Sequence, residues 1–369
     1  MSIKDSVTEF FSGLKNKKSD TFVGIDIGSS YIKIVQLKKE KGRILLDTYG
    51  SIALGPYQDE GFSGQLTNLE AEKITEALQN LLEQANVTAK SAVISVSSST
   101  SLIFVLKVPP VTEKELAGVI QNEARKYIPV PLSEISLDWW VIPQREMYDT
   151  AGVPTKRETE VLVTAVRNEV VFRYNTIAES IGAFRDVRLE IETFSAARGS
   201  LKHELSPVML LDFGASGVRM AIIEHGIVRK FRAVNRGSAF FTNTIQKSLN
   251  VDFAEAENLK KQVGLNRESP RQEVYSIIQS GMQYIFSEIQ NVIFDFEKTH
   301  QKPLSKIILA GGGSRLHSLK DEIESRYNIF TAFADPFSKA SAPDFLDDVL
   351  SKAGPEFAVA LGLALQGVE

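Results

Sequence analysis

Three short glycine-rich segments, two of which begin with aspartate, carry the residues best suited to chemistry. The first runs Asp26-Ile-Gly28-Ser29-Ser30. Glycine lets the backbone approach an anion closely, and serine hydroxyls can donate hydrogen bonds to phosphate oxygens. Lys33 follows and could neutralise phosphate charge. Because a phosphate would repel Asp26 unless a cation lay between them, the segment indicates Mg²⁺ held through water. Taken alone, the segment fits a plain hairpin better than a binding site.

The same pattern returns later in the chain. An apolar run leads to Asp212, and Gly214, Ala215, Ser216 and a further glycine follow before a second apolar run. Two segments with the same spacing between aspartate and glycine are much less expected by chance than one. They suggest two similar half-domains that face one ligand.

A third segment consists of the consecutive glycines Gly311, Gly312 and Gly313, which follow the apolar run 306–310. Three glycines let the backbone approach a flat base or a phosphate, and the helical pattern after them would present its N-terminus to an anion. The segment lacks the Gly-x-Gly-x-x-Gly spacing of a dinucleotide fold, and no Gly-Lys-Ser/Thr phosphate loop occurs in the chain. Neither of these two known motifs therefore predicts where a nucleotide would bind.

Strands are needed to position these segments. β-Branched residues dominate 21–37 on both sides of the first turn, and 208–223 repeats that arrangement. Each range is therefore expected to form a strand, a tight turn and a second strand. The run 306–310 is expected to be a strand that ends at the three glycines.

The region between the first two segments predicts a compact α+β unit. Thr112 and Glu115 form a capping box that opens a helix. Strands are expected over 133–142 and 158–166, and Asn168 is expected to cap a further helix.

The composition excludes several classes of function. The 369 residues include 42 Lys and Arg against 46 Asp and Glu, a net charge of −4 at pH 7. This balance gives no overall basic field, so no nucleic-acid partner is expected. Because cysteine is absent, disulfides, thiol nucleophiles and cysteine metal sites are excluded. No apolar run reaches the roughly 18 residues of a membrane span, and the protein is expected to be cytoplasmic.

The segment 2–18 forms a unit of its own. Apolar residues from Ile3 to Leu14 recur at helical spacing, and lysines outnumber acidic residues. A short helix that lies on an anionic membrane or docks on a partner fits this pattern. A helix packed on the protein's own surface fits it equally well.

In combination and in this order, the three segments resemble the motifs of the actin-like ATPase superfamily. Asp26 to Ser30 looks like its first phosphate loop, with Lys33 at the place of a phosphate-contacting lysine. The Asp212 segment looks like the second phosphate loop, and 309–315 looks like the adenosine motif. The resemblance implies an ATP and Mg²⁺ site, with Asp26 and Asp212 as the metal carboxylates. It assigns cofactor binding to Asp26, Gly28, Ser29, Ser30, Lys33, Asp212, Gly214, Ala215, Ser216, Gly237, Glu257, Lys260, Gly311, Gly312, Gly313 and Arg315.

Two further segments match the helices of that superfamily. The segment 192–199 resembles the helix that links the two halves, and 354–364 resembles the return helix. Small residues in both would permit close packing at a hinge. Glu192 falls where some members carry a water-orienting glutamate, and it could equally be a partner of the helix dipole.

The implied fold is α/β: two similar half-domains around a nucleotide cleft, with an inserted α+β subdomain of the type found in the FtsA and PilM families. The expected units are an amphipathic N-terminal segment (1–20), a first half-domain (21–97 and 186–205, with the return helix 354–369), an inserted partner-binding subdomain (98–185) and a second half-domain (206–353, with a helical insertion at about 236–300).

Two runs in the inserted region favour one branch of the superfamily. The run from Glu123 to Pro131 and the run Leu137-Asp-Trp139-Trp140-Val resemble segments of the PilM family of type IV pilus assembly proteins. The chain also lacks the C-terminal linker and membrane helix expected of FtsA. The resemblance implies an ATP-binding scaffold at the inner face of the cytoplasmic membrane.

The PilM resemblance further implies specific partners. The protein would bind the N-terminal tail of a PilN-like inner-membrane protein and link it to pilus motor components. The tail would lie in the cleft between the inserted subdomain and the first half-domain. Trp139 and Trp140 are candidate anchors, of which one should face the core because they occupy adjacent strand positions. Residues 2–18 would add a peripheral membrane contact.

Several expectations stay open at this point. Tight binding of ATP with Mg²⁺ is expected, with slow or undetectable hydrolysis. The alternatives are an FtsA-like, filament-forming cell-division protein and a small-molecule kinase of the same superfamily, although no extra motif for a sugar-binding cleft is present. The pattern from Gly281 to Phe296 fits a homo-oligomer face, and a core helix fits it better.

Overall fold

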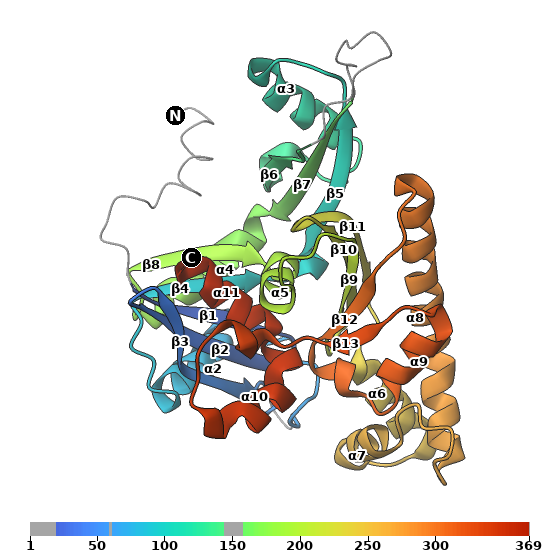
Figure 1. Ribbon diagram of the computed structural model, residues 1–369. Coiled ribbons are helices and arrows are strands. Elements are labelled where there is room, and N and C mark those ends of the chain that lie inside the picture. Colours follow the sequence, from blue (N-terminus) through green and yellow to red (C-terminus); the bar gives the residue numbers. More distant parts are fainter. Residues whose placement is uncertain (1–19, 59–60, 144–157, 369) are drawn as a thin grey trace.

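A computed structural model describes residues 20–58, 61–143 and 158–368 of the chain. Two sheets lie side by side around a central pair of helices, and a smaller subdomain stands at one end of the molecule (Figure 1). The expected amphipathic segment at 2–18 lies outside the described residues, as does the last residue of the expected return helix. Among the helices of the described ranges, none combines the length and hydropathy that a membrane span needs.

The first sheet has the strand order β3-β2-β1-β4-β8. β1, β2 and β3 are antiparallel neighbours, whereas β4 and β8 run parallel to β1. The helices α2 and α4 pack on one face of this sheet, over a core of β-branched and leucine side chains. The elements are β1 (Thr21–Ile27), β2 (Tyr31–Glu40), β3 (Arg43–Ala53), η1 (Gly55–Tyr57), α2 (Ala71–Gln84), β4 (Ser91–Val96), η2 (Ser98–Thr100), α4 (Asn168–Ile181) and β8 (Asp186–Ile191).

The second sheet has the order β11-β10-β9-β12-β13 and repeats the pattern of the first. Three antiparallel strands are again followed by two parallel ones. The two hairpins predicted over 21–37 and 208–223 are therefore confirmed, and they hold equivalent places in their sheets. The elements are β9 (Val208–Phe213), β10 (Val218–Glu224), β11 (Ile227–Val234), α6 (Ser238–Leu249), α7 (Phe253–Val263), α8 (Gln272–His300), β12 (Lys306–Ala310), η4 (Gly312–Arg315), α9 (Leu319–Tyr327), β13 (Thr331–Phe333), η5 (Pro336–Lys339), η6 (Asp344–Leu346), α10 (Asp347–Ala353) and η7 (Gly354–Phe357).

The long helix α8 forms part of the core of the second half. A Cβ on Gly281 would lie 2.8 Å from the ring of Phe241, and Phe296 is only 1% exposed. Most of the apolar side chains between these positions are buried in the same cluster. Of the two interpretations left open by the sequence, the core helix is confirmed for this stripe.

The helices α5 (Glu192–Ser200) and α11 (Ala358–Val368) cross between the two sheets. Their contact depends on glycine: a Cβ on Gly362 would overlap the carbonyl oxygen of Ser195, and a Cβ on Gly199 would overlap that of Ala358. Gly24 of β1 lies equally close to the backbone of α11. The small residues of 192–199 and 354–364 therefore allow α5 and α11 to pack closely, as the sequence predicted.

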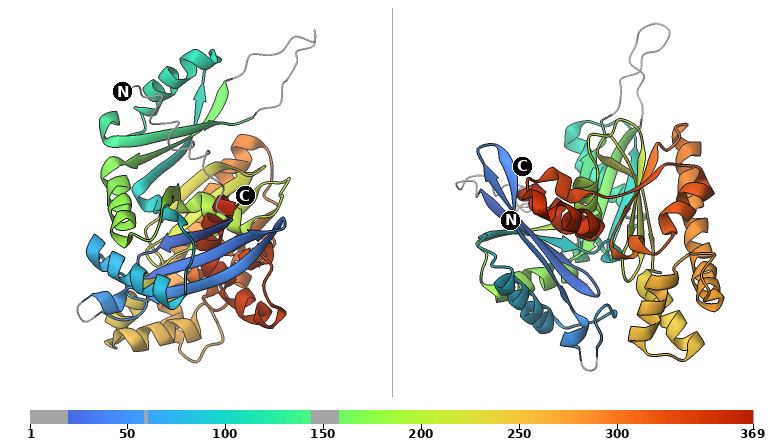
Figure 2. Two further views of the ribbon diagram at one scale, coloured as in Figure 1. Left: turned by 90° about the vertical axis from the view of Figure 1, so that its left-hand side faces the viewer. Right: turned by 60° about the horizontal axis from the view of Figure 1, so that its bottom comes forward.

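The inserted subdomain consists of a three-stranded sheet with one helix on its outer face (Figure 2). The order is β5-β7-β6, with all pairs antiparallel. The capping box of Thr112 and Glu115 is confirmed at the start of the helix. The elements are β5 (Ser101–Val108), α3 (Glu113–Ala124), η3 (Leu132–Glu134), β6 (Ile135–Val141) and β7 (Thr159–Arg167).

The start of α4 differs from the sequence prediction. The helix begins at Asn168 itself, and Arg167 occupies the N-cap position. The amide of Asn168 is already engaged, because its Nδ2 donates to the carbonyl of Ser133 and its Oδ1 accepts from the hydroxyl of Ser136. Asn168 therefore joins α4 to β6 and does not cap the helix. Further along α4, Ile177 packs in the core of the first half.

Candidate nucleotide site

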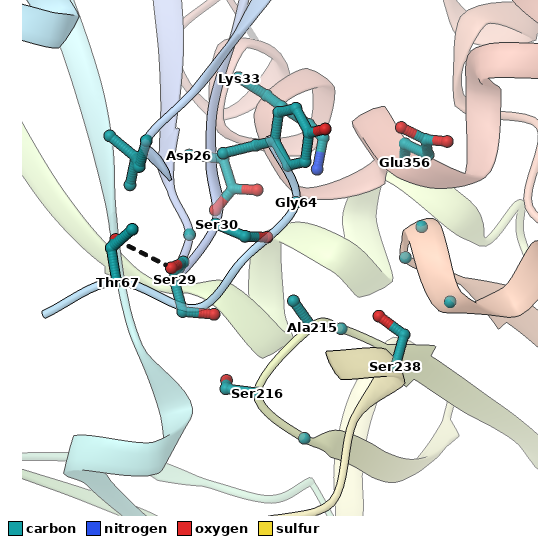
Figure 3. A pocket seen from close by; sticks show the side chains of 18 of the residues that line it. Asp26, Ser29, Ser30, Lys33, Gly64, Thr67, Ala215, Ser216, Ser238 and Glu356 are labelled. Carbon is teal, nitrogen blue, oxygen red and sulfur yellow. Dashed lines mark hydrogen bonds between the residues drawn. The ribbon is translucent and has the colours of Figure 1, made fainter. Parts of the chain in front are cut away.

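A cavity of about 1130 Å³ lies between the two halves of the molecule. Figure 3 shows Asp26, Ser30 and Lys33 on the side of the first half, and Ala215 and Ser216 on a loop of the second half across from them. All three segments singled out in the sequence line this cavity. The wall includes Asp26, Gly28, Ser29, Ser30, Lys33, Glu192, Asp212, Gly214, Ala215, Ser216, Glu257, Lys260, Gly311, Gly312, Gly313 and Arg315.

The first turn is a tight connection between β1 and β2. The amide of Gly28 donates to the carbonyl of Tyr31 at 3.0 Å, and a Cβ on Gly28 would lie 2.8 Å from that oxygen. Ser95 of β4 supports the turn, because its hydroxyl donates to Asp26 Oδ1 at 3.0 Å and accepts from the amide of Ile27 at 3.0 Å. Glycine and the serine network together fix the carboxylate at the edge of the cavity.

The second turn is fixed by a helix behind it. Gly214 donates to the carbonyl of Gly217 at 2.9 Å, and the first amide of α6, from Ser238, donates to the carbonyl of Gly214 at 3.0 Å. A Cβ on Gly237 would overlap the backbone of this turn. Gly237 thus lies behind the loop and not in the cavity wall, where it lets α6 approach the turn.

Burial raises the pKa of both cavity aspartates. Asp26 has a pKa of about 6, because desolvation and the nearby Glu192 carboxylate outweigh Lys33 and the hydrogen bond from Ser95. Asp212 has a pKa of about 7, because burial, Glu192 and Asp26 outweigh Arg219 and Lys33. Carboxylates that share a cleft in this way favour a cation between them or a proton on one of them.

Glu192 is the first residue of α5 and points into the cavity wall. Its Oε1 accepts a hydrogen bond from the amide of Ser98 at 2.8 Å and lies 3.4 Å from Nε of Arg219. Neither partner belongs to α5. The carboxylate is therefore fixed between η2 of the first half and β10 of the second.

On α7 the expected pair of Glu257 and Lys260 is formed and is largely buried. Lys260 Nζ donates to Glu257 Oε2 at 2.6 Å and to the hydroxyl of Thr242 at 3.0 Å. Burial lowers the pKa of Lys260. Burial also acts to raise the pKa of Glu257, yet the charge and hydrogen bond of Lys260 bring it below its ordinary value. The ion pair thus presents polar groups to the cavity from one helix face.

The glycine-rich segment follows β12 and runs close to the second turn. Gly311 has a φ of 78°, in the left-handed region that favours glycine, and its amide donates to the carbonyl of Pro355 at 2.7 Å. A Cβ on Gly311 would overlap the Asp212 carboxylate. Arg315 donates to the carbonyls of Ser351 and Lys352, so its guanidinium also holds the end of α10.

Sequence reasoning missed several residues of the cavity wall. Arg219 of β10 is one, although the chain carried a signal: it follows Asp212 at the offset at which Lys33 follows Asp26. In both hairpins the basic residue is the cross-strand partner of the aspartate. Other missed residues lie in the loop after η1, in α4, in α7 and in η7, and include Phe62, Ser63, Gly64, Thr67, Arg173, Tyr174, Phe253 and Glu356.

Two of these missed residues meet across the cavity. The rings of Phe62, from the first half, and Phe253, from the second, stack with centroids 5.9 Å apart and planes inclined by 17°. Phe253 is buried, whereas Phe62 is half exposed. No local sequence pattern links the two positions, since 190 residues separate them and only the fold brings them together.

Comparison with known proteins places these features in a family. A family model described as type IV pilus assembly protein PilM matches residues 24–368. The solved PilM-PilN type IV pilus biogenesis complex is 24% identical, with a TM-score of 0.78 over 96% of this chain and 100% of that one.

More distant solved structures share the fold. Ethanolamine utilization protein EutJ from Carboxydothermus hydrogenoformans is 13% identical, with a TM-score of 0.53 over 98% of this chain and 96% of that one. MreB5 of Spiroplasma citri bound to ADP is 12% identical, with a TM-score of 0.51 over 94% of this chain and 95% of that one. These likenesses show the actin-like fold that the three motifs predicted.

Proposed function

The chain belongs to the type IV pilus assembly protein PilM family, and from this premise we propose that it is an ATP-binding scaffold that captures the tail of a PilN-like inner-membrane protein. The observation that carries the proposal is the match over both halves and the inserted subdomain to a protein solved in complex with PilN. The tail would come from the cytoplasmic N-terminus of that partner, and the scaffold would link it to the pilus motor.

The cavity fits a nucleoside triphosphate with Mg²⁺. Ser29, Ser30 and Lys33 supply donors and positive charge from the first turn, and the second turn faces them across the cavity. The metal ion, when bound, would neutralise phosphate charge next to Asp26 and Asp212. The raised pKa of both aspartates fits this role, because a cation between them would remove the cost of keeping both ionised.

The nucleoside would lie toward α7 and the glycine-rich segment. Glu257 and Lys260 form a buried polar pair on that side of the cavity. Gly312 leaves room for a flat base, since it has no backbone neighbour within 4 Å of where its Cβ would stand, whereas Gly311 and Gly313 pack closely against Asp212 and Phe213. These contacts would orient the nucleotide with its phosphates toward the two turns.

We propose slow or no turnover of the bound nucleotide. Glu192 is the group suggested to orient a water molecule, and its Oε1 is already engaged by Ser98 and Arg219. An oxygen that already accepts a hydrogen bond from the Ser98 amide is less available to accept one from an attacking water molecule. Binding without rapid hydrolysis suits a scaffold.

The partner tail would dock on the inserted subdomain beside the first half. In β6, Trp139 packs into the core under α3, as one of the two tryptophans was expected to do. Trp140 points to the other face and is 60% exposed. Its cross-strand neighbour Leu162 is buried against the body of the molecule, so this face is covered at β7 and open at the edge strand β6. An exposed tryptophan on an edge strand is a suitable anchor for an extended peptide.

The remaining parts of the proposal follow from the same family membership. They are the division into first half, inserted subdomain and second half near the boundaries given above, with α4 counted in the first half because it packs on the first sheet, and a position at the inner face of the cytoplasmic membrane through the partner. Contact of residues 2–18 with the membrane and self-association also belong to the proposal.

The test is titration of the purified protein with a synthetic peptide from the N-terminal tail of its PilN-like partner. Saturable binding at micromolar or lower peptide concentration is expected, and Trp140→Ala should weaken it about tenfold or more. Phe345→Ala is the matched control, since Phe345 is 80% exposed on η6 of the second half. Absence of binding with and without ATP and Mg²⁺ would contradict the scaffold function.

A further inference from the structure

Arg219 carries a buried guanidinium without a hydrogen-bond acceptor in the described part of the chain. The residue is 7% exposed, and its Nε and Nη1 atoms have no hydrogen-bond partner there. Its ion-pair partner is Glu192, at 3.4 Å between Oε1 and Nε, which is a loose contact for such a pair. Burying a guanidinium with its donors unused is costly, and an anionic ligand would offset that cost.

The second turn is shaped around this guanidinium. A Cβ on Gly217 would overlap Nη1 of Arg219, so glycine at that position leaves the space that the side chain occupies. Arg219 is also the cross-strand partner of Asp212 in β10 and lines the cavity. The backbone thus fixes the arginine inside the wall that faces the candidate phosphate position.

Arg219 corresponds to Lys33 in the internal repeat of the fold. Lys33 is the cross-strand partner of Asp26 in the first hairpin, as Arg219 is of Asp212 in the second. The two hairpins face each other across the cavity, so each half contributes one aspartate and one basic residue. The basic residues differ in kind: a guanidinium can bind two phosphate oxygens through its planar fork, whereas an ammonium acts as a point charge.

The position of Arg219 along the cavity sets which part of a nucleotide it would meet. α7, with Glu257 and Lys260, lies at the outer edge of the second half, whereas α5, which carries Glu192, lies between the sheets (Figure 1). A nucleotide bound with its nucleoside toward α7 extends its phosphates toward α5. The phosphate farthest from the nucleoside would be the one nearest to Glu192 and Arg219.

We propose that Arg219 binds the terminal phosphate of a nucleoside triphosphate and makes this site discriminate triphosphate from diphosphate. The inference rests on the proposed function and adds a residue with a defined role to it. When the terminal phosphate is present, it supplies the acceptors that the guanidinium lacks. When it is absent, Arg219 has Glu192 alone as its partner.

The experiment measures Mg²⁺-dependent binding of AMPPNP and of ADP by calorimetry for the wild type and for Arg219→Gln. The substitution should weaken AMPPNP binding about ten- to a hundredfold, which is the range for hydrogen bonds to a charged group. ADP binding should change less than about threefold. Arg229→Gln is the matched control: Arg229 lies on the neighbouring strand, is largely buried, and pairs with Glu160 and Glu224 outside the cavity.

Each outcome separates this inference from the proposed function. If the wild type binds neither nucleotide, the nucleotide site itself is wrong. If the wild type binds both and Arg219→Gln weakens both equally or neither, Arg219 only balances the charge of Glu192, and the inference is overturned. The double variant Glu192→Gln with Arg219→Gln keeps the charges balanced, so it provides the same comparison if the single variant does not fold.

Discussion

At the scale of single residues, the cavity is defined by ionisable groups that the fold holds close together. Burial and the Glu192 carboxylate raise the pKa of Asp26 and of Asp212, whereas Lys33 lowers the pKa of both and Arg219 lowers that of Asp212. Such an arrangement is unfavourable for a structural core and favourable for a site that binds a cation together with an anion. The residues that define the cavity therefore make the free protein sensitive to pH.

The first prediction concerns that pH dependence. In the folded, nucleotide-free protein Asp26 and Asp212 have pKa values of about 6 and about 7, against 3.8 for an unperturbed aspartate. Between these limits the folded chain retains protons that the unfolded chain has released, so the free energy of unfolding falls as the pH rises through that window. Asp212→Asn removes one such group and should reduce the fall.

Thermal unfolding without nucleotide, scanned from about pH 5 to about pH 8, measures this effect. The melting temperature of Asp212→Asn should decline less than that of the wild type toward high pH and should end above it. Asp348→Asn is the control, because Asp348 is exposed on α10. Parallel curves for the wild type and Asp212→Asn would show that the carboxylate is not destabilised by burial.

At the scale of elements, the two hairpins and the helix pair between the sheets determine the site. The hairpins were predictable because the alternation of β-branched residues and the Asp-x-Gly turn are local signals. The start of α4 was not predicted correctly, because the side chain of Asn168 forms hydrogen bonds with Ser133 and Ser136 of a neighbouring segment instead of capping the helix. The offset of Arg219 from Asp212 was a local signal, but the burial of its guanidinium could not be predicted, since it depends on other elements that cover β10.

The contact of α5 with α11 gives a second prediction. A Cβ on Gly362 would overlap the carbonyl oxygen of Ser195 and lie 3.0 Å from the amide nitrogen of Gly199, and backbone atoms cannot rotate away. Gly362→Ala should therefore lower the free energy of unfolding by about 3 kcal/mol. Urea titration followed by circular dichroism measures it.

Gly118→Ala in α3 is the matched control for that substitution. A Cβ on Gly118 meets no atom within 4 Å, so alanine should be neutral or stabilise the helix by up to about 1 kcal/mol. Equal effects of the two substitutions would mean that the helices can separate at little cost.

At the scale of the whole molecule, α5 and α11 lie between the two halves at the base of the cavity, and an aromatic contact spans the cavity. The stacked rings of Phe62 and Phe253 come from opposite halves. A pair of this kind contributes about 0.5–1.5 kcal/mol beyond its buried area. The contact would therefore restrain opening of the cavity without locking it.

Phe62→Ala tests this restraint, given that the protein binds nucleotide. Release of a fluorescent nucleotide should become about two- to tenfold faster, in line with the loss of an aromatic pair. Stopped-flow displacement by unlabelled nucleotide measures the rate, with Phe345→Ala as a control on an exposed phenylalanine of the second half. An unchanged rate would mean that the cavity opens elsewhere.

The position of α11 has a consequence for how the protein is made. Strand β1 packs against this helix, and the Lys39 ammonium of the adjoining strand donates to the carbonyl of Val368, 329 residues farther along the chain. During translation the first sheet must therefore remain without its covering helix until α11, some 329 residues beyond Lys39, has left the ribosome. Its apolar face is exposed throughout that time, which makes the nascent chain a substrate for chaperones and a risk for aggregation. A message that ended shortly before α11 would yield a chain unable to complete its first half, whichever nucleotide or partner were supplied.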